Sequence, residues 1–111
     1  MTPNKVIEIV DGVKPNSYDE EMKLRWINEL DGNVKRLVIQ DKEFIPYEYP
    51  DDMDKELLIP APFDSVYVLY LEAMIDFHNK EFGNYNNSAS MFETRFSDYK
   101  KAYIRENRAK G

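Results

Sequence analysis

The segment Val66–Phe77 constrains the fold most, because it is apolar around most of its circumference. Glu72 and Asp76 are its only charged residues. A helix on the surface of a globular protein shows one apolar stripe and one polar face. We therefore expect this segment to form a helix that is enclosed by other helices or by neighbouring subunits. It is too short, and too interrupted by carboxylates, to cross a bilayer.

Size and aromatic content indicate where further apolar surface can go. The chain has 111 residues, the size of one domain, and 14% of them are aromatic, with eight Tyr and six Phe. A domain this small buries a smaller share of its surface than a large one does. Tyr suits surfaces that are apolar in body and wet at the tip. The Tyr residues therefore indicate either subunit interfaces or the edge of the monomer core.

The charge balance and the missing cysteines exclude several classes of function. A net charge of −6 argues against general affinity for nucleic acid or anionic membranes, because both need a basic surface. Without Cys there are no disulfides, no thiol nucleophile and no Cys-ligated zinc. The opening MTPNKVIEIV lacks a basic region followed by a long apolar run, so we expect no signal peptide. These features predict a soluble intracellular protein.

Apolar spacing and capping signals predict an all-α fold, a small bundle of about four helices with one long irregular loop. The expected elements are helices at 1–13, 17–39, 62–82 and 87–106, a loop at 40–61 and a tail at 107–111. Thr2 as N-cap and Pro3 at the first helical position begin the first helix. Ser17 and Glu20 have the spacing of a capping box for the second helix. Gly32 lies inside that helix, where we expect a bend.

Further signals define the other boundaries. Asp76 and Lys80 have the i,i+4 spacing of an ion pair on the third helix, and Gly83 is expected to end that helix. The loop at 40–61 carries three Pro and seven acidic residues against two Lys, so a loose β-hairpin around Asp51 is an alternative to irregular structure. The second helix carries an apolar stripe of Met22, Trp26, Leu30, Val34 and Leu37.

The sequence offers few residues for chemistry, and we expect a protein that is not an enzyme and binds no metal or cofactor. His78 has no paired ligand motif around it. The acidic cluster near Asp51 lacks the glycine of a calcium loop, and no glycine-rich phosphate loop is present. Glu72 and Asp76 fit a narrow polar strip on a packed helix better than a pair of catalytic carboxylates.

Three stretches in order resemble the head–tail connector proteins, also called adaptor or head-completion proteins, of tailed siphophages and related prophages. They are SYDEEMKLRWINELDG (Ser17–Gly32), KELLIPAPFDSVYVLYLEAMIDFHNKEFGNYNNSASMF (Lys55–Phe92) and SDYKKAYIREN (Ser97–Asn107). The similarity covers nearly the whole chain. It rests on several pieces in the correct order, since none of them is a catalytic signature.

The resemblance implies a helical subunit that forms a ring, typically dodecameric in the family, beneath the portal protein. Such a ring extends the DNA channel without sequence-specific binding and provides the docking platform for a tail-side stopper or completion protein. The expected location is the virion, after assembly in the host cytoplasm. Residues expected to contact neighbouring subunits or partners are Phe44, Tyr47, Tyr49, Tyr67, Tyr70, Lys100, Lys101, Arg105 and Arg108. The alternative is a small intracellular helical protein-binding or regulatory module without a virion role.

Overall fold

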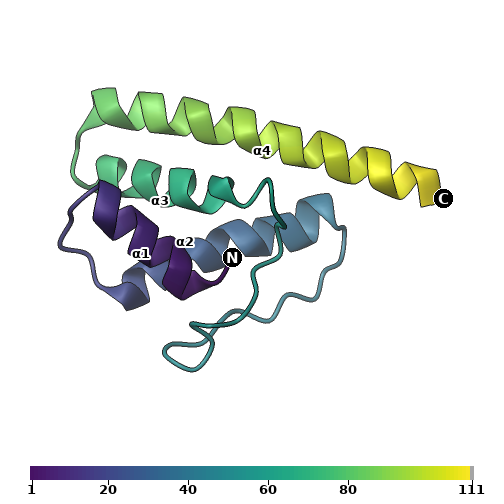
Figure 1. Ribbon diagram of the computed structural model, residues 1–111, viewed down its shortest axis with the longest axis horizontal. Helices are drawn as coiled ribbons and strands as arrows, with labels where there is room; N and C mark the ends of the chain where they lie inside the picture. Colours follow the sequence, from purple (N-terminus) through teal and green to yellow (C-terminus); the bar gives the residue numbers. More distant parts are fainter. Residues whose placement is uncertain (111) are drawn as a thin grey trace.

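The structure, a computed structural model, describes the backbone of residues 1–110 and the side chains of residues 1–107. Within these residues the chain forms four α-helices and one π-helical turn (Figure 1). They are α1 (Pro3–Val13), α2 (Glu20–Asn33), η1 (Val34–Val38), α3 (Ser65–His78) and α4 (Phe82–Lys110). No strand occurs in this part of the chain, so the all-α fold is confirmed and no hairpin forms in the loop.

α3 is the central helix, as its apolar circumference predicted. α4 packs along one side of α3, and α1 and α2 pack on the other (Figure 1). Val66, Tyr67 and Leu71 of α3 are fully buried. Helices of the same chain therefore cover much of the apolar surface of this segment. Among residues 1–110, no helix is both long and apolar enough to cross a membrane.

α1 begins as the sequence predicted. The Thr2 hydroxyl accepts a hydrogen bond from the Lys5 amide at 3.2 Å, and Pro3 occupies the first turn, where a missing N–H costs nothing. Val6 and Val10 are fully buried. Val13 is 62% exposed, because it is the last residue of the helix and lies beyond the packed layer.

α2 begins three residues later than expected, and the predicted capping box is wrong. The N-cap is Asp19, whose carboxylate accepts a hydrogen bond from the Met22 amide at 2.8 Å. Ser17 lies outside the helix, and Glu20 is its first residue. An aspartate at this position also suits the positive end of the helix dipole.

A π-helical turn follows α2 directly, close to the bend predicted at Gly32. In this turn the Ile39 amide bonds to the Val34 carbonyl at 3.0 Å, one residue further along than in an α-helix. The wider turn keeps Val34 buried but moves Leu37 out of the predicted stripe, so that Leu37 is 68% exposed. Gln40 then ends the turn with a φ of 64°.

The break between α3 and α4 lies nearer the N-terminus than predicted. Lys80 has a φ of 60°, the Glu81 amide bonds to the Asp76 carbonyl at 2.9 Å, and the Lys80 amide bonds to the Phe77 carbonyl at 3.0 Å. These are the two bonds of a Schellman motif, with Lys80 at the left-handed position that glycine usually occupies. Gly83, the expected stop, instead lies in the first turn of α4.

α4 is much longer than the helix that supports it. It has 29 residues and α3 has 14, so at 1.5 Å per residue they span about 44 Å and about 21 Å. The predicted helix at 87–106 is thus extended at both ends. Residues 107–110 of the expected tail at 107–111 continue the helix, and residue 111 lies outside the described residues. The C-terminal end of α4 projects beyond the other helices (Figure 1).

Candidate functional site

The long connection between η1 and α3 is fastened to the core at Asp31. The Asp31 carboxylate is fully buried on α2 and accepts hydrogen bonds from the hydroxyls of Tyr47 and Tyr67, both at 2.6 Å. It also accepts a bond from the Leu58 amide at 3.2 Å. The Tyr67 hydroxyl in turn accepts from the Ile59 amide at 2.8 Å. One carboxylate therefore ties together α2, α3 and two points of the loop.

Burial is the main influence on the pKa values of Asp31, Tyr47 and Tyr67. It raises the pKa of Asp31 above its ordinary value, and the hydrogen bonds from Tyr47, Tyr67 and the Leu58 amide oppose that rise. Burial and the neighbouring Asp31 carboxylate also raise the pKa of Tyr47 and of Tyr67. Both hydroxyls therefore remain protonated donors over the physiological range, so the arrangement is a structural latch.

A second set of contacts fixes the first part of the loop. Asn28 on α2 pairs with the main chain of Tyr47, accepting from its amide at 2.7 Å and donating to its carbonyl at 3.0 Å. The half-buried Phe44 packs near Gly32, where a Cβ added to the glycine would lie 3.5 Å from the Phe44 ring. Phe44 and Tyr47 both point inward, and Ile45 between them is 84% exposed.

The second part of the loop is held against α1. The Asn4 amide donates to the Met53 carbonyl at 2.9 Å, and the Asn4 side chain donates to Asp54 at 2.7 Å. The side chains of Met53, Leu57 and Ile59 are buried in the main core cluster. The acidic loop is thus packed into the fold, despite its composition.

A second buried carboxylate lies at the other end of the bundle. Asp76 of α3 is fully buried, and it pairs with the Lys14 ammonium at 2.7 Å and accepts from the Ser88 hydroxyl at 3.0 Å. The predicted pairing of Asp76 with Lys80 is wrong, because α3 ends at His78 and Lys80 is exposed in the following turn. Asp76 instead links α3 to α4 and to the end of α1.

The aromatic residues predicted to contact neighbours fall into two groups. Tyr67 is fully buried and Tyr47 is 9% exposed, so their expected role in contacts between subunits is corrected: both serve the fold of the chain itself. Phe44 and Tyr70 are half-buried, and Tyr49 is 45% exposed. Tyr70 packs on Phe92, and burial together with Glu29 raises the pKa of Tyr70 to about 12.

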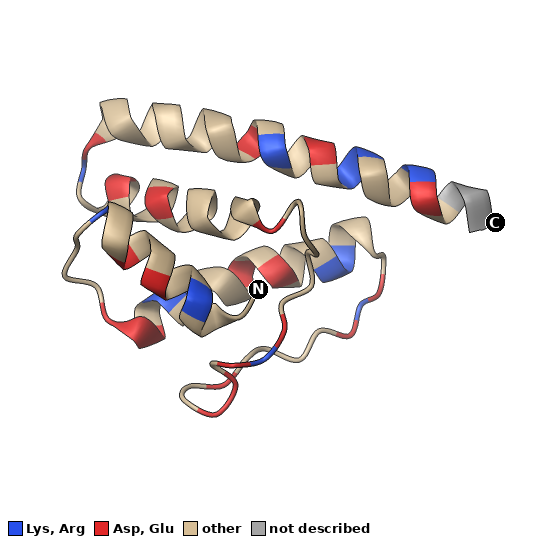
Figure 2. Ribbon diagram, viewed as in Figure 1, with Lys and Arg blue, Asp and Glu red and all other residues tan. Residues whose placement is uncertain are grey.

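The basic residues predicted as contacts lie in the C-terminal part of α4. Lys100, Lys101 and Arg105 are exposed, and within the described residues none has a carboxylate within 4 Å. Arg108 lies outside the residues whose side chains are described. Positive charge recurs toward the C-terminal end of α4, whereas the loop below the bundle is mostly negative (Figure 2).

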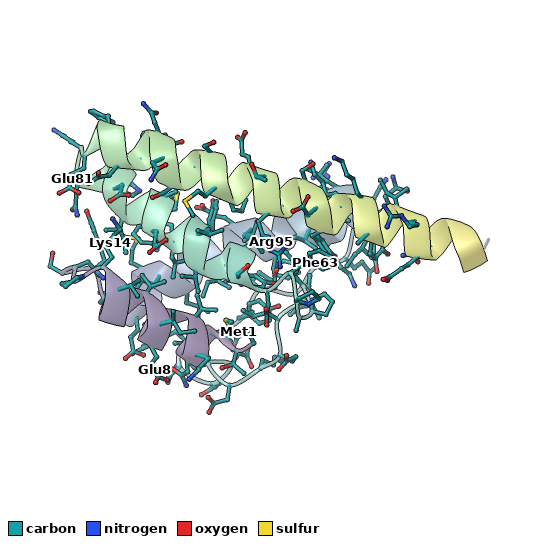
Figure 3. All side chains as sticks on the ribbon, turned by 45° about the horizontal axis from the view of Figure 1, so that its top comes forward. Met1, Glu8, Lys14, Phe63, Glu81 and Arg95 are labelled. Carbon is teal, nitrogen blue, oxygen red and sulfur yellow. The ribbon has the colours of Figure 1, made fainter. Side chains whose placement is uncertain are left out.

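Two surface hollows adjoin this part of α4. The larger, of about 360 Å³, lies between α4 and the loop and is lined mainly by apolar residues, among them Pro60, Phe63, Tyr99 and Tyr103. Arg95 closes one side of Phe63, with its guanidinium 5.2 Å from the ring centre (Figure 3). The smaller hollow, of about 90 Å³, is lined by Leu37, Val38, Gln40, Lys100 and Ile104.

The described residues contain no cluster of three or more His, Asp or Glu side chains arranged to hold a metal ion. His78 is exposed and stacks on Trp26, with ring centres 5.3 Å apart. Tyr18 packs edge-on against Trp26 at 5.4 Å. The one histidine of the chain therefore belongs to an aromatic cluster at the end of α3.

Sequence reasoning missed Asp31 and Ile45. Asp31 had a usable signal, because Ile27, Asp31 and Val34 are spaced to share one face of a helix, and a charged residue on such a face needs buried partners. Ile45 had none, since its exposure depends on how the loop is fastened to the core at Phe44 and Tyr47.

Comparison with known proteins returns no matching family model, no matching curated protein and no matching solved structure.

Proposed function

We propose that this chain is a structural subunit of a phage head–tail connector, assembling as a ring beneath the portal and presenting a docking platform to the next tail-side protein. The resemblance of three ordered sequence stretches motivates the proposal. The observation that carries it is the form of α4, a helix about 44 Å long that projects past its support with open apolar and basic surface.

The exposed side chains of α4 are those of a contact surface. Met91 is 53% exposed and Ile104 is 48% exposed. Lys100, Lys101 and Arg105 lie in the same C-terminal part of the helix without carboxylate partners among the described residues. A ring subunit contacts two neighbours and the portal, so it needs more open surface of this kind than an isolated monomer does.

The acidic balance of the chain fits the same role. DNA must slide through a connector channel, and DNA binding depends on cationic contacts. A net charge of −6 with an acidic loop lowers adhesion wherever such residues line the lumen. The basic part of α4 would then face protein, with the portal and a neighbouring subunit sharing its surface.

The decisive experiment is to mix the purified chain with the portal protein encoded beside it and to image the particles by electron microscopy. A collar of added density on the portal is expected. A triple variant, Lys100→Glu, Lys101→Glu and Arg105→Glu, should fold normally, because all three residues are exposed, and should lose that density. Portal particles that stay bare with the native chain would favour the regulatory module, and so would a gene far from portal and capsid genes.

A further inference from the structure

We infer that Ile45 of one copy docks in the hollow beside η1 and α4 of a second copy, forming a head-to-tail contact. This inference deepens the connector assignment and rests on it, since ring assembly requires contacts between copies. It joins two surfaces of the subunit that differ from each other, a protruding aliphatic side chain and a small hollow.

The loop presents Ile45 rigidly. Phe44 on one side packs toward Gly32, and Tyr47 on the other is held by Asp31 and Asn28. With Phe44 and Tyr47 held against the core, the two residues between them, Ile45 and Pro46, both face solvent. It is 84% exposed, more than any other large apolar residue in the described part of the chain. A held apolar side chain binds with little further loss of conformational entropy.

The hollow has the complementary character. Its volume is about 90 Å³, roughly that of three water molecules and suited to one branched aliphatic side chain. Leu37 and Ile104 in its wall are 68% and 48% exposed, so filling it removes apolar surface from water on both copies. It adjoins the π-helical turn, and such turns occur frequently at functional sites.

Charge favours this pairing. Glu43 and Glu48 flank Ile45 in the sequence, both are exposed, and neither has an ion pair in the described residues. Lys100 lines the hollow, and Lys101 and Arg105 follow it on α4. The acidic residues around Ile45 of one copy thus meet the basic residues beside the hollow of the other copy. This charge complementarity orients the encounter and opposes the pairing of two like surfaces.

Cysteine cross-linking tests the contact cleanly, because the native chain has no Cys. Ile45→Cys protein is mixed with Ile104→Cys or Leu37→Cys protein and oxidised mildly. The control is Ile45→Cys mixed with Val13→Cys, since Val13 is an exposed apolar residue on α1. A disulfide needs Cα atoms within about 7 Å. Residue 45 of one copy can therefore form a disulfide with residue 104 or residue 37 of another copy only when it lies in the hollow.

Mass spectrometry of the proteolysed products identifies the joined positions. Cross-links from residue 45 to residue 104 or residue 37 are expected at several times the yield of the 45–13 control. A yield no higher than that control for both walls, or a dominant 45–45 species, would overturn the inference. The Ile45→Cys, Ile104→Cys double variant should give species larger than a dimer, whereas a reciprocal dimer alone would exclude the head-to-tail arrangement.

Charge reversal gives a second readout. Glu43→Lys in the Ile45→Cys chain should lower the rate of cross-linking to Ile104→Cys, and Lys100→Glu in the partner chain should restore it. Unchanged rates in both pairings would contradict the assigned orientation. The outcome of the portal experiment is independent of the outcome of cross-linking. Cross-links without a portal collar would support the contact between copies and contradict the connector function. A collar without cross-links would support the connector function and contradict the contact.

Discussion

The Tyr67 hydroxyl on α3 donates a hydrogen bond of 2.6 Å to the Asp31 carboxylate on α2, inside a core where both side chains are fully buried. The same hydroxyl accepts from the Ile59 amide, so one oxygen joins two helices and the loop. A buried carboxylate without a cationic partner depends on its hydrogen bonds, because nothing else offsets the loss of hydration.

Replacing Tyr67 by Phe should destabilise the protein by about 2–6 kcal/mol. The change leaves one oxygen of Asp31 and the Ile59 amide without a partner, and each unsatisfied buried group costs about 1–3 kcal/mol. Chemical denaturation measures the effect. Tyr70→Phe is the matched control, because its hydroxyl makes one long 3.4 Å bond to exposed Glu29, and it should change stability by no more than about 0.5 kcal/mol. Equal losses in the two variants would contradict the latch.

Asp31 should make stability fall as the pH rises. Burial raises its pKa in the folded state above the ordinary value of 3.8, so folding favours the protonated form. The stability that this preference contributes is fully present below the unfolded pKa, and it is lost as the pH rises through the folded pKa. The free energy of unfolding of Asp31→Asn, measured from pH 4 upward, should therefore improve relative to the native chain. Parallel curves for the two proteins would refute this assignment.

Lys80→Gly should stabilise the protein by about 1 kcal/mol. Lys80 holds the left-handed position of the Schellman motif with a φ of 60°, where a side chain costs about 1–2 kcal/mol and glycine costs little. Thermal unfolding should show a higher midpoint for this variant. Lys80→Ala removes the same exposed side chain but retains a Cβ, so it should give no comparable gain. A gain of the same size with alanine would show that the effect has another origin.

Lys14→Met should cost about 2–4 kcal/mol. Asp76 is fully buried, and removing its cation leaves a buried charge with only the Ser88 hydroxyl. Breaking a buried pair costs about 3–5 kcal/mol, and the partial exposure of Lys14 lowers that figure. Lys5→Met breaks an exposed pair with Glu8 at 3.7 Å and should cost at most about 0.5 kcal/mol. Denaturation of both variants side by side checks the prediction.

Local signals in the sequence predicted the parts of the fold that local chemistry determines. Thr2 and Pro3 gave the start of α1 correctly, and the apolar circumference of Val66–Phe77 identified the central helix. The N-cap of α2 was misplaced because Ser17 and Asp19 are both good caps. Only packing beyond the helix decides between them.

The end of α3 and the contacts of the loop were not accessible in the same way. Lys80, and not a glycine, adopts the left-handed conformation that follows the end of α3, whereas Gly83 lies inside α4. In both places tertiary packing overrides weak residue preferences. Tyr47 and Tyr67 were predicted to face neighbours. Their burial depends on hydrogen bonds to Asp31, which is 16 positions from Tyr47 and 36 positions from Tyr67 in the sequence. Contacts over such separations produce no regular spacing that a sequence pattern could reveal.

The π-helical turn at Val34–Val38 acts as a one-residue insertion in an otherwise continuous helix. Deleting one residue there would restore α-helical spacing, rotate the side chains between the turn and Gln40 about the axis and turn Leu37 toward the core. Homologues that differ in length by a single residue in this turn would therefore present different surfaces from nearly identical sequences. A gap of that size in an alignment would mark a change of partner more reliably than many substitutions elsewhere.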